Sequence, residues 1–395
     1  MGASTQPDLA YRRVVALTGT LFLSYLAVAM SLPAVPVYVV QDLRLDNALG
    51  GLAVGIAFLS TILTRPFAGA RADRLGGKNA MQKGLVIYAG AGLIGLLSSS
   101  SHLSALGDYA LLIVGRLLLG LGESLTMVGM ISWSLGLMSP ARSGRVMSLV
   151  GMGMYGAFAA GGPLGLALLH RFGFQGLMSV CTLLPLLGLV AINRFPAASL
   201  LVGQRESIWQ IIGRVWRMGG VVGLGGVGFA VLGSFFALYF MSRGWPYAGL
   251  GMTVFGVGFV LVRLVCGHLP DRIGGTRVAI ASLFVEACGQ YLLWAAHGPS
   301  LALLGAFLTG LGCSMVYPSM GSEVVKQVPA HLRGTAMGAF VAFQDLAYGL
   351  TGPLVGLLAD SAGYSPVFLI GGVATTIGLC LAIGVHRSLK RVDSV

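Results

Sequence analysis

A short charged segment occurs twice in this chain, 198 positions apart, and it constrains the fold more than any other feature. The first copy covers residues 65–78 and reads RPFAGARADRLGGK; the second covers residues 263–277 and reads RLVCGHLPDRIGGTR. Six residues keep a constant spacing in both copies, and each copy lies between two apolar stretches. Membrane chains that contain such a repeat consist of two related helical halves, an architecture typical of secondary transporters.

The composition indicates that most of the chain lies in lipid. Hydrophobic residues make up 56% of the sequence and charged residues 10%, whereas a soluble domain carries about 25% charged residues. Apolar stretches of about 20 residues are typical of membrane-spanning helices. Such stretches cover residues 14–40, 48–70, 80–101, 109–138, 145–169, 175–195, 219–242, 248–269, 278–296, 301–327, 335–360 and 366–386. We therefore predict an all-α membrane protein with twelve transmembrane helices.

The repeat extends beyond the charged segment and divides the chain into halves. In the fourth and tenth stretches the offset is 190 residues, which aligns Gly120 with Gly310. The only long segment between stretches is 196–218, which is basic and contains two tryptophans. We predict two pseudo-symmetric six-helix bundles, residues 1–195 and 219–395, joined by a cytoplasmic linker along the inner membrane surface.

The net charge of +12 is a topology signal and not a nucleic-acid footprint. With a cytoplasmic N-terminus, 19 of the 25 Lys and Arg residues lie on the cytoplasmic side, as the positive-inside rule requires. We therefore expect a multi-pass protein of the inner (plasma) membrane with both termini in the cytoplasm. The six His and five Cys residues are scattered and no P-loop occurs, so we expect no metal, no cofactor and no enzyme activity.

The charged segment and the fourth stretch resemble the major facilitator superfamily. The family's loop G-x-x-x-D-R-x-G-x-K corresponds to residues 69–78 here, and its arginine followed by G-x-G corresponds to Arg116, Gly120 and Gly122. The resemblance covers essentially the whole chain and looks closest to a bacterial branch of efflux-permease-like carriers. It implies the major facilitator fold, but these motifs do not specify a substrate.

The resemblance also implies that the repeated segment is a conformational latch, which holds one state of the carrier and breaks in the other. Its glycines allow a tight turn, and Asp73 is able to cap a helix or to pair with a neighbouring arginine. The residues of the expected latch are Gly69, Asp73, Arg74, Gly76, Lys78, Asp271 and Arg272. The simpler alternative is a topology anchor that contains a turn.

Three acidic residues, Glu123, Glu286 and Asp345, lie near the centres of predicted helices four, nine and eleven. A charge at mid-bilayer costs about 2.5–3.5 kcal/mol or more, so such residues are paired or functional. The family fold implies that helices four and eleven border the solute cavity, and we therefore expect Glu123 and Asp345 to carry the coupled proton. On the peripheral helix nine, Glu286 is expected to pair with Arg263 or to make another polar contact. Glu323, near the cytoplasmic end of helix ten, is expected to be a surface or gate charge.

Arg116 lies seven residues before Glu123, on the same helix face and two turns away. It is expected to bind an anionic group or to neutralise that acid. Aromatic, sulfur and amide side chains on the cavity-lining helices suit an amphipathic or sugar-like solute, although each is equally consistent with helix packing. With Arg116, the predicted solute-binding residues are Tyr25, Met127, Tyr155, Phe236, Tyr239, Tyr317, Phe343, Gln344 and Tyr348.

These features predict a monomeric secondary active transporter that moves a small organic solute across the inner membrane by alternating access. Its partners are the solute, protons and the lipid bilayer, and not a nucleic acid. Proton-coupled efflux by antiport is our first interpretation, and symport of a sugar-like or organic-acid solute is the alternative. The first predicted helix lacks an acid, and residues 162–166 (GPLGL) depart from the antiporter signature, so direction and coupling stay open. A channel or a lipid flippase fits the two-bundle repeat less well.

The charge distribution predicts that the segment 196–218 faces the cytoplasm. A cysteine introduced at Gln204 is therefore expected to be protected from a membrane-impermeant thiol reagent added to intact cells, and to react once the cells are permeabilised. Labelling of this cysteine in intact cells would reverse the predicted orientation.

Overall fold

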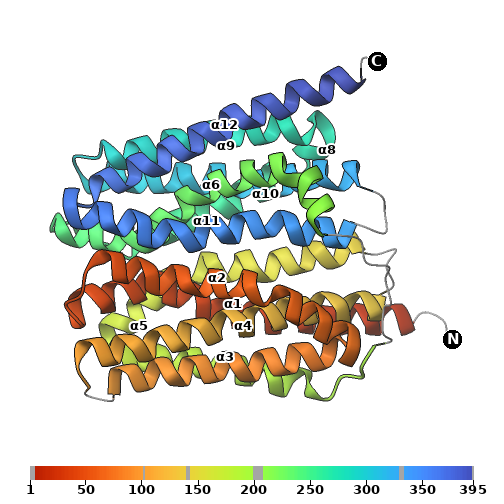
Figure 1. The fold of residues 1–395 in the computed structure, drawn as a ribbon, viewed down its shortest axis with the longest axis horizontal. Coiled ribbons are helices and arrows are strands. Elements are labelled where there is room, and N and C mark those ends of the chain that lie inside the picture. The colour runs from red at the N-terminus through yellow and green to blue at the C-terminus, as the bar shows by residue number, and fades with distance from the viewer. Residues whose placement is uncertain (1–4, 101–102, 139–142, 199–207, 329–332, 394–395) are drawn as a thin grey trace. The chain divides into compact units, whose positions relative to one another are not determined.

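The computed structural model is helical throughout the residues that it describes, which are 5–100, 103–138, 143–198, 208–328 and 333–393 (Figure 1). No strand occurs in these ranges. Nine of the described helices are long and apolar enough to cross a membrane. These observations confirm the predicted all-α membrane fold, because an apolar helix satisfies its own backbone hydrogen bonds and so needs no water.

The described residues of the first half form five helices and one π-helical turn. They are α1 (Thr5–Val37), η1 (Tyr38–Asp42), α2 (Asn47–Leu75), α3 (Gly77–Ser100), α4 (Ala105–Met138) and α5 (Ser143–Asn193). Helix α5 holds the fifth and sixth predicted spans, and the helical backbone is interrupted between them at Gly173, with φ 66° and ψ −175°. The two parts of α5 thus correspond to two of the twelve predicted spans.

In the second half, the part of the chain that the structure describes forms seven helices. They are α6 (Ile208–Ser242), α7 (Leu250–Cys266), α8 (Leu269–Ile273), α9 (Gly275–Trp294), α10 (Pro299–Gln327), α11 (Arg333–Ala362) and α12 (Ser365–Asp393). The short α8 lies in the second copy of the charged segment, and each of the other six overlaps one predicted span. The helix order is therefore consistent with twelve spans.

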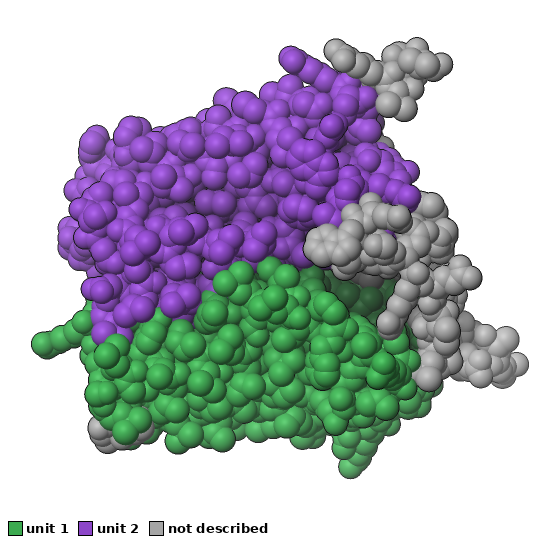
Figure 2. Space-filling view, viewed as in Figure 1, with its two compact units in different colours: residues 1–44, 56–202 green, residues 45–55, 203–395 purple. Residues whose placement is uncertain are grey.

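The chain forms two compact units, which Figure 2 colours separately. Unit 1 comprises residues 1–44 and 56–202, and unit 2 comprises residues 45–55 and 203–395. Part of the predicted linker, residues 199–207, lies outside the described residues. The rest of it after residue 207 is continuous with α6, and its residues Ile211, Val215 and Met218 are buried in the core of unit 2. The exact domain boundaries stay a prediction.

In unit 1, α3 and α4 lie side by side and touch through their backbones (Figure 1). A methyl group added at Gly84 would lie 2.6 Å from the amide nitrogen of Thr126 and 2.9 Å from the carbonyl oxygen of Gly122. A methyl group at Gly122 would lie 3.0 Å from the amide nitrogen of Tyr88. Small residues at both surfaces let helices approach this closely in lipid, where dispersion contacts replace the hydrophobic effect.

In unit 2, α9 and α10 pack against each other as closely as α3 and α4 do in unit 1. The offset of 198 residues relates α3 to α9, and the offset of 190 residues relates α4 to α10. Gly312 is the counterpart of Gly122, and a methyl group there would lie 2.6 Å from the Cβ atom of Glu286, the counterpart of Tyr88. A methyl group at Gly289 would lie 2.6 Å from the amide nitrogen of Thr309. The internal repeat therefore extends from the charged loops to the contacts between helices.

Unit 2 also contains a polar cluster at the start of α2. The Asp360 carboxylate accepts hydrogen bonds from the backbone N–H groups of Asn47 (2.8 Å) and Ala48 (3.0 Å), and so caps the helix N-terminus. The Tyr364 hydroxyl donates to Asn47 Oδ1 at 2.7 Å. Burial raises the pKa of the Tyr364 hydroxyl, an effect opposed by that hydrogen bond.

Replacing Gly84 by alanine is expected to destabilise unit 1, because the methyl group must displace the backbone of α4. Overpacking of this kind costs about 1–3 kcal/mol. Gly90 lies on the same helix, and a methyl group added there would meet no atom of another helix within 4 Å, so Gly90→Ala is the matched control. Thermal unfolding of both variants in detergent measures the difference. Equal unfolding temperatures would contradict the packing argument.

Candidate proton and solute sites

Glu123 on α4 is the centre of a buried polar cluster in unit 1. Its side chain is 4% exposed. Oε1 accepts a hydrogen bond of 2.9 Å from the Tyr25 hydroxyl of α1, and Oε2 accepts one of 3.3 Å from the Thr61 hydroxyl of α2. Three helices therefore meet at one carboxyl group. The structure thus brings together two of the predicted residues, and adds Thr61.

A close approach between α2 and α4 creates this geometry. The backbone of α4 at Gly120 contacts the backbone of α2 at Ala57, and a methyl group at Gly120 would lie 2.7 Å from Ser60 Cβ. The Thr61 hydroxyl also lies 3.0 Å from the carbonyl oxygen of Ala57 on its own helix and 3.2 Å from that of Gly120, so Glu123 Oε2 shares the single proton of that hydroxyl with two other acceptors. A larger residue at Gly120 would move Thr61 away from Glu123.

Tyr25 links the acid to the neighbouring Met127. Its hydroxyl lies 3.3 Å from Met127 Sδ as well as 2.9 Å from Glu123 Oε1. A hydroxyl carries a single proton to donate, so the carboxylate and the weak thioether acceptor compete for it. The hydroxyl therefore has a second acceptor if Glu123 becomes protonated.

Arg116 lies two turns before Glu123 and is 5% exposed. Its Nη1 donates a hydrogen bond of 2.9 Å to the Ser31 hydroxyl of α1. The guanidinium lines a cavity of about 20 Å³ together with Tyr88 of α3 and Cys181 of α5. That volume has room for about one water molecule. The Tyr88 hydroxyl has no hydrogen-bond partner among the described residues, so the cavity offers polar groups to a small occupant.

In unit 2, Asp345 is 7% exposed on α11. The adjacent Gln344 donates from Nε2 to the Tyr348 hydroxyl at 2.7 Å. The Tyr348 ring packs against Phe229 of α6, with ring centroids 5.1 Å apart. Three of the predicted solute-binding or proton-carrying residues therefore lie on two successive turns of α11.

The other aromatic residues predicted in unit 2 make packing contacts. The Tyr239 hydroxyl donates toward the carbonyl oxygens of Leu293 and Ala296 at the end of α9, and the ring is fully buried. Phe236 is stacked on a neighbouring ring, Tyr317 packs against Phe340, and Phe343 lies against Gly219 of α6. The side chain of Tyr155 lies outside the described residues.

The expected ion pair between Glu286 and Arg263 is wrong. Arg263 donates from Nε to the Ser314 hydroxyl and from Nη2 to the Ser314 carbonyl oxygen, both at 3.1 Å. No hydrogen bond from the described residues reaches either carboxyl oxygen of Glu286. The reason is that the carboxyl group of Glu286 points toward α6, whereas the guanidinium of Arg263 on α7 is bonded to Ser314 of α10.

Comparison with known proteins agrees with this geometry. The family model of the Major Facilitator Superfamily matches residues 17–250 and 226–393. The chain belongs to the Major Facilitator Superfamily. It is therefore a multi-pass membrane protein of a transporter family, as the sequence resemblance implied.

Relatives share this assignment over nearly their whole length. An uncharacterized MFS-type transporter of Salmonella typhimurium is 42% identical over 375 residues, which cover 95% of this chain and 96% of the relative. A second, from Pseudomonas aeruginosa, is 40% identical over 380 residues, covering 96% and 94%.

Solved structures show the same fold at low sequence identity. The D-xylose-proton symporter has a TM-score of 0.77 at 17% identity, covering 95% of this chain and 97% of its own. The human organic anion transporter MFSD10 has a TM-score of 0.70 at 17% identity, covering 94% and 99%. These likenesses show the major facilitator fold.

The family's charged loop forms a tight turn in both copies. Gly76 and Gly274 occupy equivalent positions and have φ values of 85° and 93°, which favour glycine because an L side chain is strained there. Asp73, Arg74 and Arg272 are exposed. The side chain of Asp271 lies outside the described residues. The turn is as the sequence predicted, and the latch role stays a prediction.

Lys78 ties this turn to the end of α5 within unit 1. Its ammonium group donates to the carbonyl oxygens of Asn193 (2.9 Å) and Phe195 (2.6 Å). The ammonium also lies 5.9 Å from the ring centroid of Trp133, whose Nε1 donates to the Pro196 carbonyl oxygen at 3.0 Å. Cations are favourable near exposed carbonyl groups at a helix C-terminus. This contact was not foreseen from the sequence.

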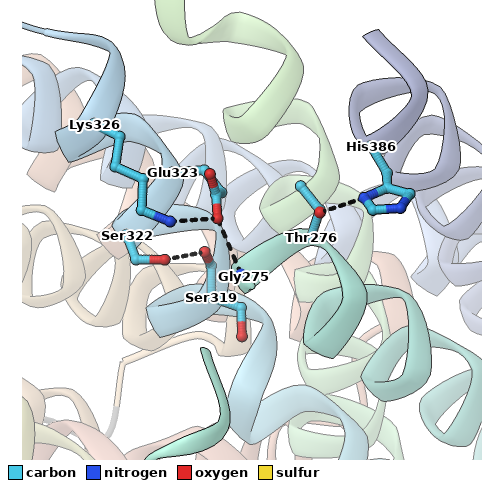
Figure 3. A network of polar contacts seen from close by, with 7 residues as sticks. All are labelled: Gly275, Thr276, Ser319, Ser322, Glu323, Lys326 and His386. Atoms are coloured by element: carbon cyan, nitrogen blue, oxygen red, sulfur yellow. Dashed lines mark hydrogen bonds and ion pairs between the residues drawn. The ribbon is translucent and has the colours of Figure 1, made fainter. Parts of the chain in front are cut away.

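The second copy of the loop carries a different polar network (Figure 3). Glu323 of α10 accepts hydrogen bonds from the backbone N–H of Gly275 at the start of α9 and from Lys326, both at 3.0 Å. Thr276 lies 2.7 Å from Nδ1 of His386 on α12. Glu323 is 7% exposed and caps α9, so it does not project from the surface, and the alternative that it is a gate charge stays a prediction.

Replacing Lys78 by methionine is expected to lower the stability of unit 1 by about 1–2 kcal/mol, because carbonyl oxygens at the end of α5 lose a charged donor. Lys83 lies on the same helix and is exposed, so Lys83→Met is the matched control. Thermal unfolding in detergent measures both. If the two variants unfold alike, Lys78 does not clamp α5.

Proposed function

We propose that this chain is a proton-coupled carrier of a small organic solute, in which Glu123 binds the coupled proton. Membership of the Major Facilitator Superfamily supports transport by alternating access. The single observation that supports proton coupling is the carboxyl group of Glu123, buried in the membrane fold with hydroxyl donors on both oxygens. A buried carboxyl group exchanges protons when its surroundings change.

Protonation of Glu123 changes the contacts between helices. An ionised carboxylate accepts hydrogen bonds from both Tyr25 and Thr61, whereas a protonated oxygen becomes a donor. The Tyr25 hydroxyl then turns toward Met127, its second acceptor. The proton thereby alters how α1 and α2 are held to α4, which is the link between chemistry and motion that a carrier needs.

Arg116 gives the site its charge selectivity. Its guanidinium is buried two turns from Glu123 and is anchored by Ser31. We propose that it binds an anionic group of the solute or balances the charge of Glu123 when the proton leaves. In unit 2, Asp345 is a second candidate for the proton, and the aromatic and amide side chains of α10 and α11 are further candidates for solute contact.

We further propose efflux by antiport, with the repeated loop as the latch between states. Symport is the second candidate, because the fold matches that of the D-xylose-proton symporter and the same acids serve either direction. We place the carrier in the inner membrane as a monomer with cytoplasmic termini and no catalytic activity.

Glu123→Gln is expected to reduce solute flux driven by a pH gradient by roughly tenfold or more, which corresponds to about 1.4 kcal/mol in the barrier. Solute exchange at equal pH is expected to survive, because the amide keeps the shape of the site. Asp345→Asn is tested in parallel. The measurement is gradient-driven flux and exchange in the same liposomes, across a panel of solutes with a pH-sensitive dye.

The control is Asp46→Asn, since Asp46 is an exposed acid in the loop before α2. It is expected to leave both fluxes unchanged. If Glu123→Gln and Asp345→Asn both retain full gradient-driven flux, neither acid couples transport to protons. Reversing the gradient in the wild type distinguishes antiport from symport.

A further inference from the structure

Glu286 is the most deeply buried acid of unit 2, and no part of the function proposed above uses it. Its side chain is 0% exposed in the middle of α9. A methyl group at Gly228 of α6 would lie 2.7 Å from Oε1, and one at Gly225 would lie 3.5 Å from Oε2. The carboxyl group therefore faces the glycine surface of α6, which offers no side chain.

Neither oxygen of this carboxyl group has a hydrogen-bond partner among the described residues. One turn further along α9, Gln290 directs its amide donor elsewhere, to the Gly228 carbonyl oxygen and the Thr309 hydroxyl, both at 3.2 Å. The Gln290 carbonyl oxygen, Oε1, is also without a partner. Gln290 therefore directs its amide donor to Gly228 and Thr309 and not to the acid.

No counter-charge faces Glu286 from the helices packed around it. Residues 219–242 of α6, 300–322 of α10 and 366–385 of α12 contain no Asp, Glu, Lys, Arg or His. On α10 the Cys313 thiol lies within electrostatic range of both Glu286 and Arg263. That arginine is held by Ser314.

The remaining charged groups on α9 and its neighbours lie toward the helix ends, and the titratable groups inside these helices, Cys288, Tyr317 and Cys380, carry no positive charge. Tyr291 of α9 bonds Thr376, and His386 of α12 bonds Thr276. Arg277 begins α9, and Arg272 of α8 is exposed. None of these groups supplies a positive charge to the carboxyl group.

A buried carboxylate without a partner is far more costly than a neutral acid, and such a group takes up a proton instead of remaining ionised. We propose that Glu286 is a proton-binding site of unit 2, which holds one proton while α6 is packed on α9. The ligand is the proton itself, bound to a carboxyl oxygen. Release requires α6 to separate from α9, because Gly225 and Gly228 seal the group.

The internal repeat sets this site apart from Glu123. Glu286 is the counterpart of Tyr88, whereas the counterpart of Glu123 is Cys313. Each unit therefore carries one acid at an equivalent depth of its glycine-packed helix pair. In unit 1 this acid lies on the second helix of the pair, α4, and in unit 2 it lies on the first, α9. Glu123 has two hydroxyl donors, which favour the carboxylate, and Glu286 has none. Different surroundings of this kind separate the protonation states of two acids.

Infrared spectroscopy of the purified full-length protein tests the proposal without any substrate. A protonated carboxylic acid has a carbonyl stretching band that a carboxylate lacks. At neutral pH the wild type is expected to show such a band for glutamate, identified by its shift after isotopic labelling of the glutamate carboxyl groups. Glu286→Gln is expected to abolish it. Transfer to heavy water is expected to shift the band slowly, because the site is sealed.

The four glutamates of the chain allow a matched control. Glu323→Gln is expected to leave the band unchanged, because Glu323 has a lysine and a backbone N–H as partners. A band that persists in Glu286→Gln, or a labelled wild type without any glutamate acid band, would overturn the proposal. A labelled Glu123→Gln variant is expected to keep the band, which separates Glu286 from the buried Glu123 and decides the question even if Glu286→Gln fails to fold. Because no transport is measured, failure of this test is distinguishable from failure of the proposed transport function.

Discussion

Direct contact between helix backbones is the feature on which the rest of this structure depends. Gly84 and Gly122 remove the side chains between α3 and α4, and Gly289 and Gly312 do the same between α9 and α10. In lipid, helices gain little from burying apolar surface against each other, so close packing of small residues must hold the bundle together. These contacts also fix how α3 is aligned along α4 and how α9 is aligned along α10. The position of every polar group along these helices is fixed with them.

That register places an acid in each unit and gives the two acids different surroundings. Glu123 extends from α4 toward α1 and α2, where Tyr25 and Thr61 offer hydroxyl groups. Glu286 extends from α9 toward a run of glycines on α6. The packing is therefore conserved between the halves of the chain while the chemistry has diverged. A repeated scaffold supports two unlike sites because helix contacts depend on the small residues and not on the acids.

Much of the fold was predictable from the sequence because its signals are local. Apolar stretches give the spans, and the repeated loop predicts a turn at Gly76 and Gly274, where the positive φ values were found. Helical periodicity places Arg116 and Glu123 on one face of α4.

The partners of these residues were not predictable. Thr61 and Ser31 are ordinary hydroxyl residues in apolar helices, and both also bond a carbonyl oxygen of their own helix. No local pattern shows that Thr61 also reaches Glu123 or that Ser31 also accepts from Arg116. Lys78 and Glu286 show the same limit, since their surroundings come from α5 and α6, which are distant in sequence. Aromatic residues such as Tyr239 were equally ambiguous, because a ring packs or binds with the same chemistry.

In the proposed mechanism, proton binding and solute binding meet in unit 1 at the hydroxyl of Tyr25. It has one proton to donate and two acceptors, Glu123 Oε1 at 2.9 Å and Met127 Sδ at 3.3 Å. An ionised carboxylate is the stronger acceptor, so the hydroxyl stays with Glu123 until that acid is protonated. A solute that offers an acceptor near Met127 then competes for the same hydroxyl group. In the proposed mechanism, proton binding and solute binding therefore act on one hydrogen bond, and a buried acid makes transport depend on pH through that bond alone.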